Sequence, residues 1–217
     1  MKKNMLNFFA AALLLSSCNN AGKDEKTKTD SANTTKTEVK ADKPAAPMDS
    51  AAMNKAWQEF MTPGVMHKWM EKSNGTWEAE VSTWMSADAP PSKSKATNVQ
   101  HSALGGRYVI SNFSSNMMGS PMEGIATMGY DNGKKMFVST WIDNMGTGII
   151  YMTGTYDSVT KTLHMKGLQT DPFTGKDTDI REELTMIDDN TYSQVMYGAG
   201  LDGKEMKFME GTFKKKK

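Results

Sequence analysis

Turn signals recur along the chain after residue 75, at intervals of about 10 to 15 residues. Asn-Gly and Asp-Gly pairs supply the positive φ angles that tight hairpins require. The segments between the turns are rich in Thr, Tyr, Val, Ile, Met and Trp, which favour strands. The pattern predicts about ten strands, at residues 76–86, 95–104, 106–114, 121–131, 135–143, 147–157, 161–168, 178–187, 191–198 and 204–213.

The short links between these strands predict an antiparallel meander. No segment of helix length separates successive strands, which excludes parallel β-α-β units. A long meander exposes two edges unless it closes, and closure into a barrel removes both. Gly124, Gly148, Gly154 and Gly211 fall within strands and suit the bends of a small barrel. We therefore predict an all-β, up-and-down β-barrel, with a β-sandwich as the alternative.

Two helical patterns precede the first strand. Asp49 and Ser50 can cap a helix whose apolar residues follow at helical spacing, and the breaker sequence at 62–64 ends it. A second, shorter helix follows and ends before Asn74. In the first strand the alternate residues predicted to point inward are Trp77, Ala79, Val81, Thr83 and Met85. Trp84 breaks this alternation, and we expect it at the rim or under a helix.

Cys18 is the only cysteine, and it follows an apolar run at 5–15 that is too short to span a bilayer. Lys2 and Lys3 precede the run, and two small serines separate it from the cysteine. This arrangement resembles a bacterial lipoprotein signal peptide, in which the cysteine becomes the lipidated first residue. We predict a signal peptide at 1–18 and attachment to a membrane through lipid on Cys18. The alternative is an ordinary secretory leader with a chance cysteine.

Residues 19–48 have a different composition, dominated by Lys, Thr, Asp, Ser, Asn and Ala. Such a segment cannot bury enough apolar surface to order itself, so we predict a disordered tether. Residues 49–217 then form one domain. Without Lys2 and Lys3, basic and acidic residues nearly balance, which gives no indication of nucleic-acid binding. The predicted location is the bacterial cell envelope, most simply the outer membrane, facing the periplasm or the cell surface.

Gly75, Thr76 and Trp77 resemble the Gly-x-Trp opening of calycins, the superfamily of lipocalins and fatty-acid-binding proteins. In calycins the tryptophan closes the base of the barrel beneath a basic residue near the last strand. The resemblance implies this packing role for Trp77, with Lys214 or Lys215 as the basic residue.

A wider set of motifs extends the resemblance. These occur in order at His67, 75–77, 104–108, Gly124, 129–132, 139–143, 147–148, 154–157, 171–172 and 203–205. Over roughly residues 60 to 213 the chain resembles the bacterial family called domain of unknown function 1579. The resemblance implies a calycin-like barrel and implies no activity. Calycins as a class bind small, mostly apolar ligands, which makes such a ligand the expectation here by analogy of fold.

The chain uses arginine only at Arg107 and Arg181. An arginine kept among so many lysines suits bidentate recognition of a carboxylate, on a ligand or within the barrel. A structural hydrogen bond or a surface ion pair is the alternative. Glu182 shares strand parity with apolar residues, which places a carboxylate on an apolar face. We regard all three as candidate ligand-binding residues, although Glu182 is also explained by a shifted register or a rim position.

Trp141 and Asp143 share one face of a strand that ends at a turn, and Thr147 follows. An aromatic ring, a carboxylate and a hydroxyl at a barrel mouth can hold a ligand. Alternatively, Trp141 belongs to the core and Asp143 bonds its own turn.

Methionine is abundant, and Met117, Met118 and Met122 flank a loop where their thioethers could bind Cu(I). A methionine-filled, adaptable interior explains the count better, so these three are only weak metal candidates. His67, His101 and His164 fall in different elements, without a second ligand at metal spacing. No catalytic motif is present. We therefore predict no cofactor and no enzymatic activity.

Two functional hypotheses remain. The first is a lipid-anchored barrel that binds a small apolar or amphipathic molecule. The second is an envelope interaction module with a solid core that contacts partners through its surface. A continuous interior cavity favours the first, and a packed barrel with an exposed apolar patch favours the second.

Overall fold

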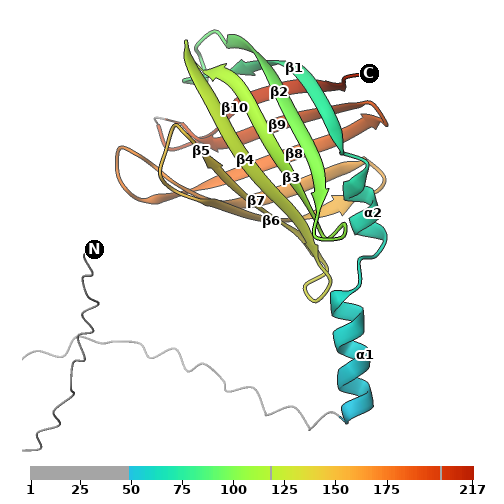
Figure 1. Ribbon diagram of the computed structural model, residues 1–217. Helices are drawn as coiled ribbons and strands as arrows, with labels where there is room; N and C mark the ends of the chain where they lie inside the picture. The colour runs from blue at the N-terminus through green and yellow to red at the C-terminus, as the bar shows by residue number, and fades with distance from the viewer. Residues whose placement is uncertain (1–48, 118, 201) are drawn as a thin grey trace, which may run out of the picture. The chain divides into compact units, whose positions relative to one another are not determined.

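The computed structural model describes residues 49–217 except 118 and 201, and its described helices and strands belong to one compact unit. Two helices, α1 (Ser50–Met61) and α2 (Val65–Glu71), precede ten strands (Figure 1). The strands are β1 (Gly75–Thr83), β2 (Ser92–Ala103), β3 (Tyr108–Met117), β4 (Ser120–Asp131), β5 (Met136–Asp143), β6 (Ile150–Asp157), β7 (Thr162–Thr170), β8 (Asp177–Asp188), β9 (Thr191–Ala199) and β10 (Glu205–Lys215). The predicted signal peptide and tether, with Cys18, lie outside the described residues.

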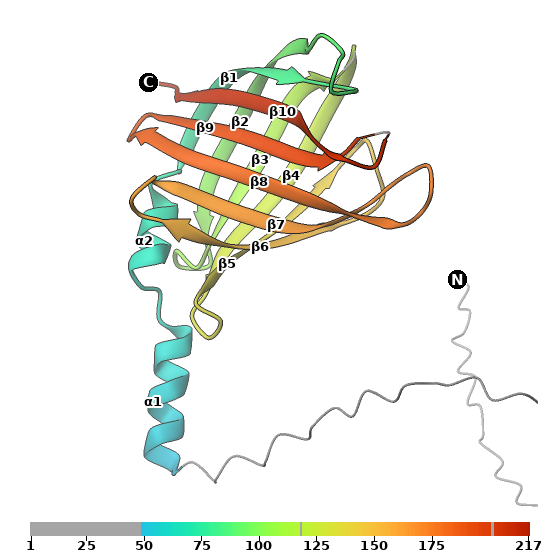
Figure 2. The same cartoon turned by 180° about the vertical axis from the view of Figure 1, so that it is seen from behind.

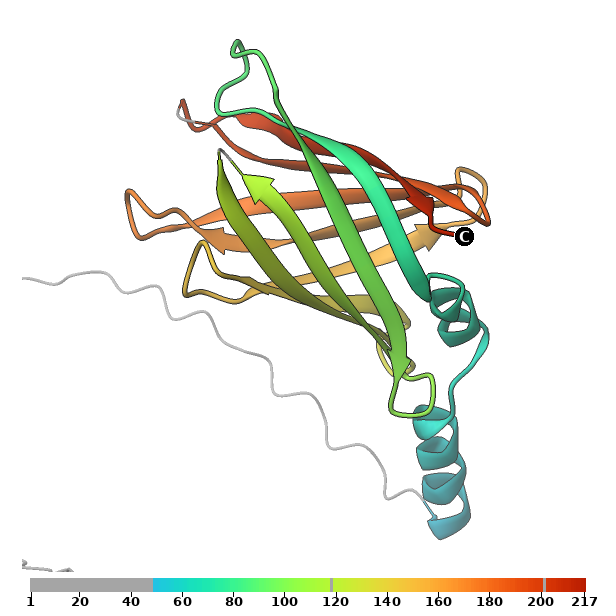
Figure 3. The same ribbon diagram turned by 45° about the horizontal axis from the view of Figure 1, so that its top comes forward.

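The ten strands form a closed antiparallel barrel in which each strand pairs with its neighbours in sequence. The first and last strands pair along their length, from Trp77 opposite Lys215 to Thr83 opposite Met209, and so close the wall (Figures 2 and 3). The predicted up-and-down barrel is confirmed, and the sandwich alternative is excluded. Among the described residues no helix has the length and apolar character needed to cross a membrane.

Several strand boundaries differ from the prediction by one to three residues, and turn geometry accounts for two of them. The third strand begins at Tyr108 and not at residue 106, because Leu104, Gly105 and Gly106 have positive φ angles and form the turn. The sixth begins at Ile150 and not at residue 147, which leaves Thr147 in an exposed loop.

Helix α2 covers one end of the barrel, and we call this the closed end (Figure 1). Met70 is buried there, and Trp69 contacts the rings of Phe137 and Tyr156 at 5.3 and 4.7 Å between centroids. The turns β2–β3, β4–β5, β6–β7 and β8–β9 lie at this end. The opposite end, which carries the turns β1–β2, β3–β4, β5–β6, β7–β8 and β9–β10, is the open end.

Helix α1 has no buried residue and extends away from the barrel (Figure 2). Its last carbonyl groups need partners because a helix end leaves them unpaired. The Asn132 side chain donates hydrogen bonds to the Glu59, Phe60 and Thr62 carbonyls, at 2.9 to 3.1 Å. The β4–β5 turn thus fixes the end of α1 against the closed end.

Strand alternation divides the side chains between wall and interior as expected. Trp77 and Val81 in β1 are buried in the interior, and Glu78 and Glu80 point outward into ion pairs with Lys216 and Lys93. Trp84 lies just beyond β1 at the rim of the open end, where the Lys207 Nζ atom is 4.5 Å from its ring centroid.

Candidate ligand-binding cavity

A cavity of about 410 Å³ occupies the barrel interior. At the closed end it reaches Trp69 and Met70 of α2 and the ring of Trp77, and at the open end it reaches Met85, Met117 and Met145. Its volume falls in the range typical of small-molecule sites, and its lining is mostly apolar, as such sites usually are. Side chains therefore fill the interior only in part.

Trp141 and Asp143 line the cavity at the open end, in the last three residues of strand β5. The Trp141 Nε1–H group donates to Asp143 Oδ2 at 2.6 Å, and Asp143 Oδ1 accepts from the Met145 and Gly146 amides. The Trp141 ring lies against Gly124, where an added Cβ would come within 2.2 Å of it. Asp143 therefore has both of the roles that were offered as alternatives. It accepts hydrogen bonds from its own turn, and it also holds the Trp141 ring at the cavity wall.

Glu182 projects from β8 into the middle of the interior, and its side chain is buried. Gln194 of β9 donates to Glu182 Oε1 at 2.5 Å. Among the described residues, no group donates to Oε2, and this oxygen is not sealed from the cavity. Burial raises the pKa of the Glu182 carboxyl, and the Gln194 hydrogen bond opposes this only in part. Glu182 therefore lies in the interior, as strand parity predicts, and neither a shifted register nor a rim position explains it.

A second polar group lies in the interior at Tyr192, which the sequence analysis did not select. Asn98 and Gln100 of β2 each donate to the Tyr192 hydroxyl at 3.3 Å. Burial, together with the nearby Glu182 charge, raises the pKa of the Tyr192 hydroxyl. Asn98, Gln100, Tyr192 and Gln194 are among the amide and hydroxyl side chains that line the cavity.

Trp77 closes the base. It is fully buried, its Nε1–H group donates to the Ser73 carbonyl at 2.7 Å, and its ring packs edge-on against Tyr192. The Lys215 Nζ atom is 5.2 Å from the Trp77 ring centroid and donates to the Lys72 carbonyl. The tryptophan and the basic residue of the last strand therefore meet where the calycin resemblance places them.

Both arginines lie outside the cavity. The Arg107 guanidinium donates to the Leu104 and Met61 carbonyls at 3.1 and 2.8 Å, so it joins the end of α1 to the β2–β3 turn. Arg107 thus makes structural hydrogen bonds and does not bind a carboxylate.

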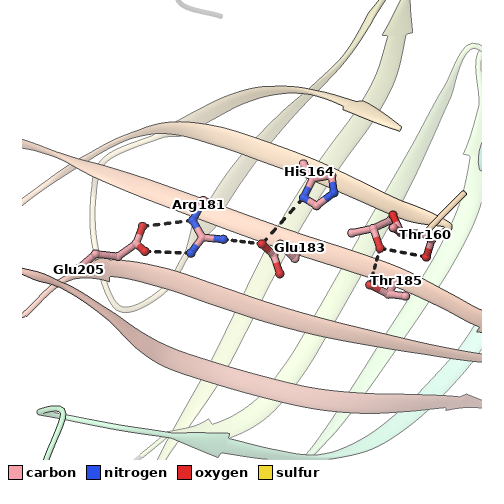
Figure 4. Close-up of polar contacts among 7 residues, drawn as sticks. Thr160, His164, Arg181, Glu183, Thr185 and Glu205 are labelled. Atoms are coloured by element: carbon pink, nitrogen blue, oxygen red, sulfur yellow. Dashed lines mark hydrogen bonds and ion pairs between the residues drawn. The ribbon is translucent and has the colours of Figure 1, made fainter. Parts of the chain in front are cut away.

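Arg181 lies on the outer face of β8 (Figure 4). It donates two hydrogen bonds to Glu205, one to Glu183, and stacks on Tyr197 at 3.7 Å. The paired carboxylate of Glu205 raises the pKa of the guanidinium. Arg181 does grip carboxylates, but they belong to the protein and form a surface ion pair. Of the predicted ligand-binding residues, Trp141, Asp143 and Glu182 therefore line the cavity, whereas Arg107, Thr147 and Arg181 do not.

Met117 and Met122 line the cavity at the open end, and Met118 lies outside the described residues. In the described part of the chain, no three His, Cys, Asp or Glu side chains converge in a way that could hold a metal ion. The thioethers supply a soft, adaptable lining at the mouth.

A wider hollow of about 850 Å³ lies along β1 and β10 and is more open to solvent. Its three carboxylates already have ion-pair partners, Glu78 with Lys216 at 2.9 Å, Glu80 with Lys93 and Glu210 with Lys207. The interior cavity, with its half-bonded carboxyl, is the stronger candidate site.

The family model described as "Protein of unknown function (DUF1579)" matches residues 62–215. The chain belongs to the DUF1579 family. No curated protein matches it. Among solved structures, the barrel is similar to that of Rv2717c from M. tuberculosis, with a TM-score of 0.56 and 10% identity over 72% of this chain and 100% of that one. It is also similar to the S-type phycobiliprotein lyase CPES from Guillardia theta, with a TM-score of 0.51 and 9% identity over 73% and 96% of the two chains. At such identities the likeness shows a shared barrel fold.

Proposed function

We propose that this DUF1579 barrel binds a small apolar or amphipathic molecule in its interior. The observation that carries the proposal is the cavity of about 410 Å³, whose surface is mostly apolar and whose polar lining includes the buried groups of Glu182, Gln194 and Tyr192. Such a lining favours an apolar body and a single polar end. We propose binding without catalysis, since Glu182 has an amide as its partner and no histidine of the described residues lines the cavity.

The test is a titration of the full-length chain carrying Cys18→Ser with a fluorescent apolar probe. Ala126 of β4 lines the cavity, whereas its neighbour Ile125 is exposed on the outer face. Ala126→Trp should fill the cavity and weaken probe binding about tenfold or more, because the bulky ring occupies the site. Ile125→Trp adds the same ring outside and should leave binding unchanged. Absence of probe binding, or equal effects of the two variants, would contradict the proposal.

The membrane anchor at Cys18 belongs to the same proposal, and the residues at 1–18 that resemble a lipoprotein signal peptide support it. Cells expressing the chain should incorporate labelled fatty acid into it, and Cys18→Ser should abolish the label. Fractionation should recover the wild-type chain with envelope membranes, most simply the outer membrane. A labelled Cys18→Ser chain would show that the lipid is attached elsewhere.

An exposed apolar face on α1 favours the second candidate, an interaction module. Met53, Trp57 and Phe60 are each more than half exposed, and the Trp57 and Phe60 rings stack at 5.8 Å. A photo-reactive residue at position 57 should then cross-link a partner in cells, whereas one at Lys55 on the polar side should not. Equal labelling at both positions would count against a specific contact.

A further inference from the structure

The charged side chains that line the cavity are all acidic. They are Asp143 at the open end and Glu182 in the middle. Among residues 49–217, apart from the undescribed 118 and 201, no lysine, arginine or histidine lines the cavity, although the chain carries 26 lysine and arginine residues. The described lining can thus carry negative charge and no positive charge, in a chain whose formal net charge is +1.

The two carboxyl groups differ in how many of their oxygens already accept hydrogen bonds. Asp143 is fully engaged, with the Trp141 indole on one oxygen and turn amides on the other. Glu182 is buried, and in the described structure its one donor is Gln194. Its strand neighbours across the ladders are Met165 and Met196, which offer no proton. Glu182 Oε2 is thus an acceptor in the cavity without a donor from the described residues.

Burial of a carboxyl group with an unpaired acceptor oxygen has a desolvation free energy that a well-packed apolar residue at the same position would not have. The cost is recovered when a bound molecule brings a donor, and most fully when that donor is charged. The aromatic rings of Phe113 and Trp141 also line the cavity, and the face of an aromatic ring tolerates a cation. A carboxylate-bearing ligand, by contrast, would meet like charge and no basic partner.

We propose that the cavity recognises an amphiphile with a basic nitrogen, and that this nitrogen donates to Glu182 while the apolar body lies along the methionine and aromatic lining. The inference rests on the proposed binding function and narrows its ligand class. It makes Glu182 the residue that determines headgroup specificity.

The experiment compares three probes with the same alkyl chain, decylamine, decanol and decanoate, by titration calorimetry at neutral pH. The full-length Cys18→Ser chain should bind decylamine about tenfold or more tightly than decanol, and decanoate least tightly. Glu182→Gln should weaken decylamine binding about tenfold and leave decanol binding unchanged. Glu183→Gln makes the same chemical change on the outer face and should preserve the wild-type order.

Three results would overturn the inference, and the first two are distinguishable from failure of the proposed function. Equal affinities for the three probes would leave the binding function intact and remove the headgroup preference. An unchanged ratio of amine to alcohol in Glu182→Gln would remove Glu182 from recognition. Binding of none of the probes would overturn both the inference and the proposed function.

Discussion

The two ends of the barrel use their tryptophans in opposite ways. At the closed end, Trp77 is buried in a cluster with Tyr192 and Phe213, whose rings stack at 4.8 Å. At the open end, Trp141 lines the cavity and is held by a hydrogen bond to Asp143 at 2.6 Å. The closed end is organised as a core, and the open end as the wall of a site.

The difference indicates how one small barrel combines stability with an interior space. Close packing of large rings excludes water and stabilises the fold. A ring fixed by a polar bond at the rim leaves its face available to a ligand. We therefore expect substitutions at the closed end to change mainly the free energy of unfolding, and those at the open end to change mainly ligand affinity.

The largest expected effect is that of Trp77→Ala. Removal of this ring leaves unfilled space beside Tyr192 and Phe213 and should lower the free energy of unfolding by about 3–5 kcal/mol, measured by denaturant titration. Trp141→Ala at the open end should cost less, about 1–2 kcal/mol, and should weaken binding of the fluorescent probe. Equal losses of stability, or full probe binding by Trp141→Ala, would break the contrast between the two ends.

The next effect concerns Glu182, midway between the ends. Its raised pKa means that the folded state keeps a proton that the unfolded state loses above about 4.5. Glu182 therefore lowers stability as the pH rises from about 4.5 through its folded pKa. Glu182→Gln should increase the free energy of unfolding at pH 8 by about 1–3 kcal/mol.

The control for that measurement is Glu183→Gln on the outer face of β8. Glu183 is half-exposed and already paired with Arg181. This variant should not be stabilised at pH 8, and the gain in Glu182→Gln should shrink as the pH approaches 4. A gain of similar size at both positions would indicate a general charge effect and not burial.

Much of the fold could be predicted from the sequence because local chemistry decided it. Turn residues such as Asn132 and Gly133 mark where hairpins must reverse, and alternation around Trp77 decides which face is inside. The same alternation correctly predicts that Glu182 points inward, because the inward or outward direction of a residue does not change when the predicted end of its strand is wrong by a few residues. Family motifs added the calycin-like closure.

The rest of the site could not be predicted, for two physical reasons. Asn98 and Gln100 are polar residues on the inner face, and by alternation alone they are indistinguishable from solvent-facing residues. Their role depends on Tyr192, which is distant in sequence and meets them only when the barrel closes. Arg107 and Arg181 were selected by residue type, but their partners on β10, α1 and the β2–β3 turn depend on tertiary structure.

A smaller effect is expected at the closed end, in the pH dependence of the free energy of unfolding. His67 in α2 is buried, and its Nδ1 atom accepts from the Gly64 amide at 2.9 Å. Burial is the main cause that lowers its pKa below 6.5. As the pH falls below about 6.5, the unfolded state gains a proton that the folded state refuses, so stability is lost.

The measurement is the free energy of unfolding between pH 7.5 and pH 5, in a Glu182→Gln background that removes the opposing slope of Glu182. His67→Gln should flatten the remaining loss by about 1 kcal/mol. A slope that is unchanged by His67→Gln would mean that acid sensitivity does not originate at the closed end.

The smallest expected effect lies on the outside of the barrel, at Arg181. Lysine at this position keeps the charge but loses the planar fork that joins Glu205 and Glu183. Since these groups are largely exposed, solvent screens their attraction, and Arg181→Lys should lower the melting temperature by at most about 2–4 °C. Its affinity for the fluorescent probe should equal that of the wild type, because the wall separates the guanidinium from the cavity. A weaker affinity in Arg181→Lys would mean that the outer ion pairs shape the interior, and ligand binding would then depend on more than the residues that line the cavity.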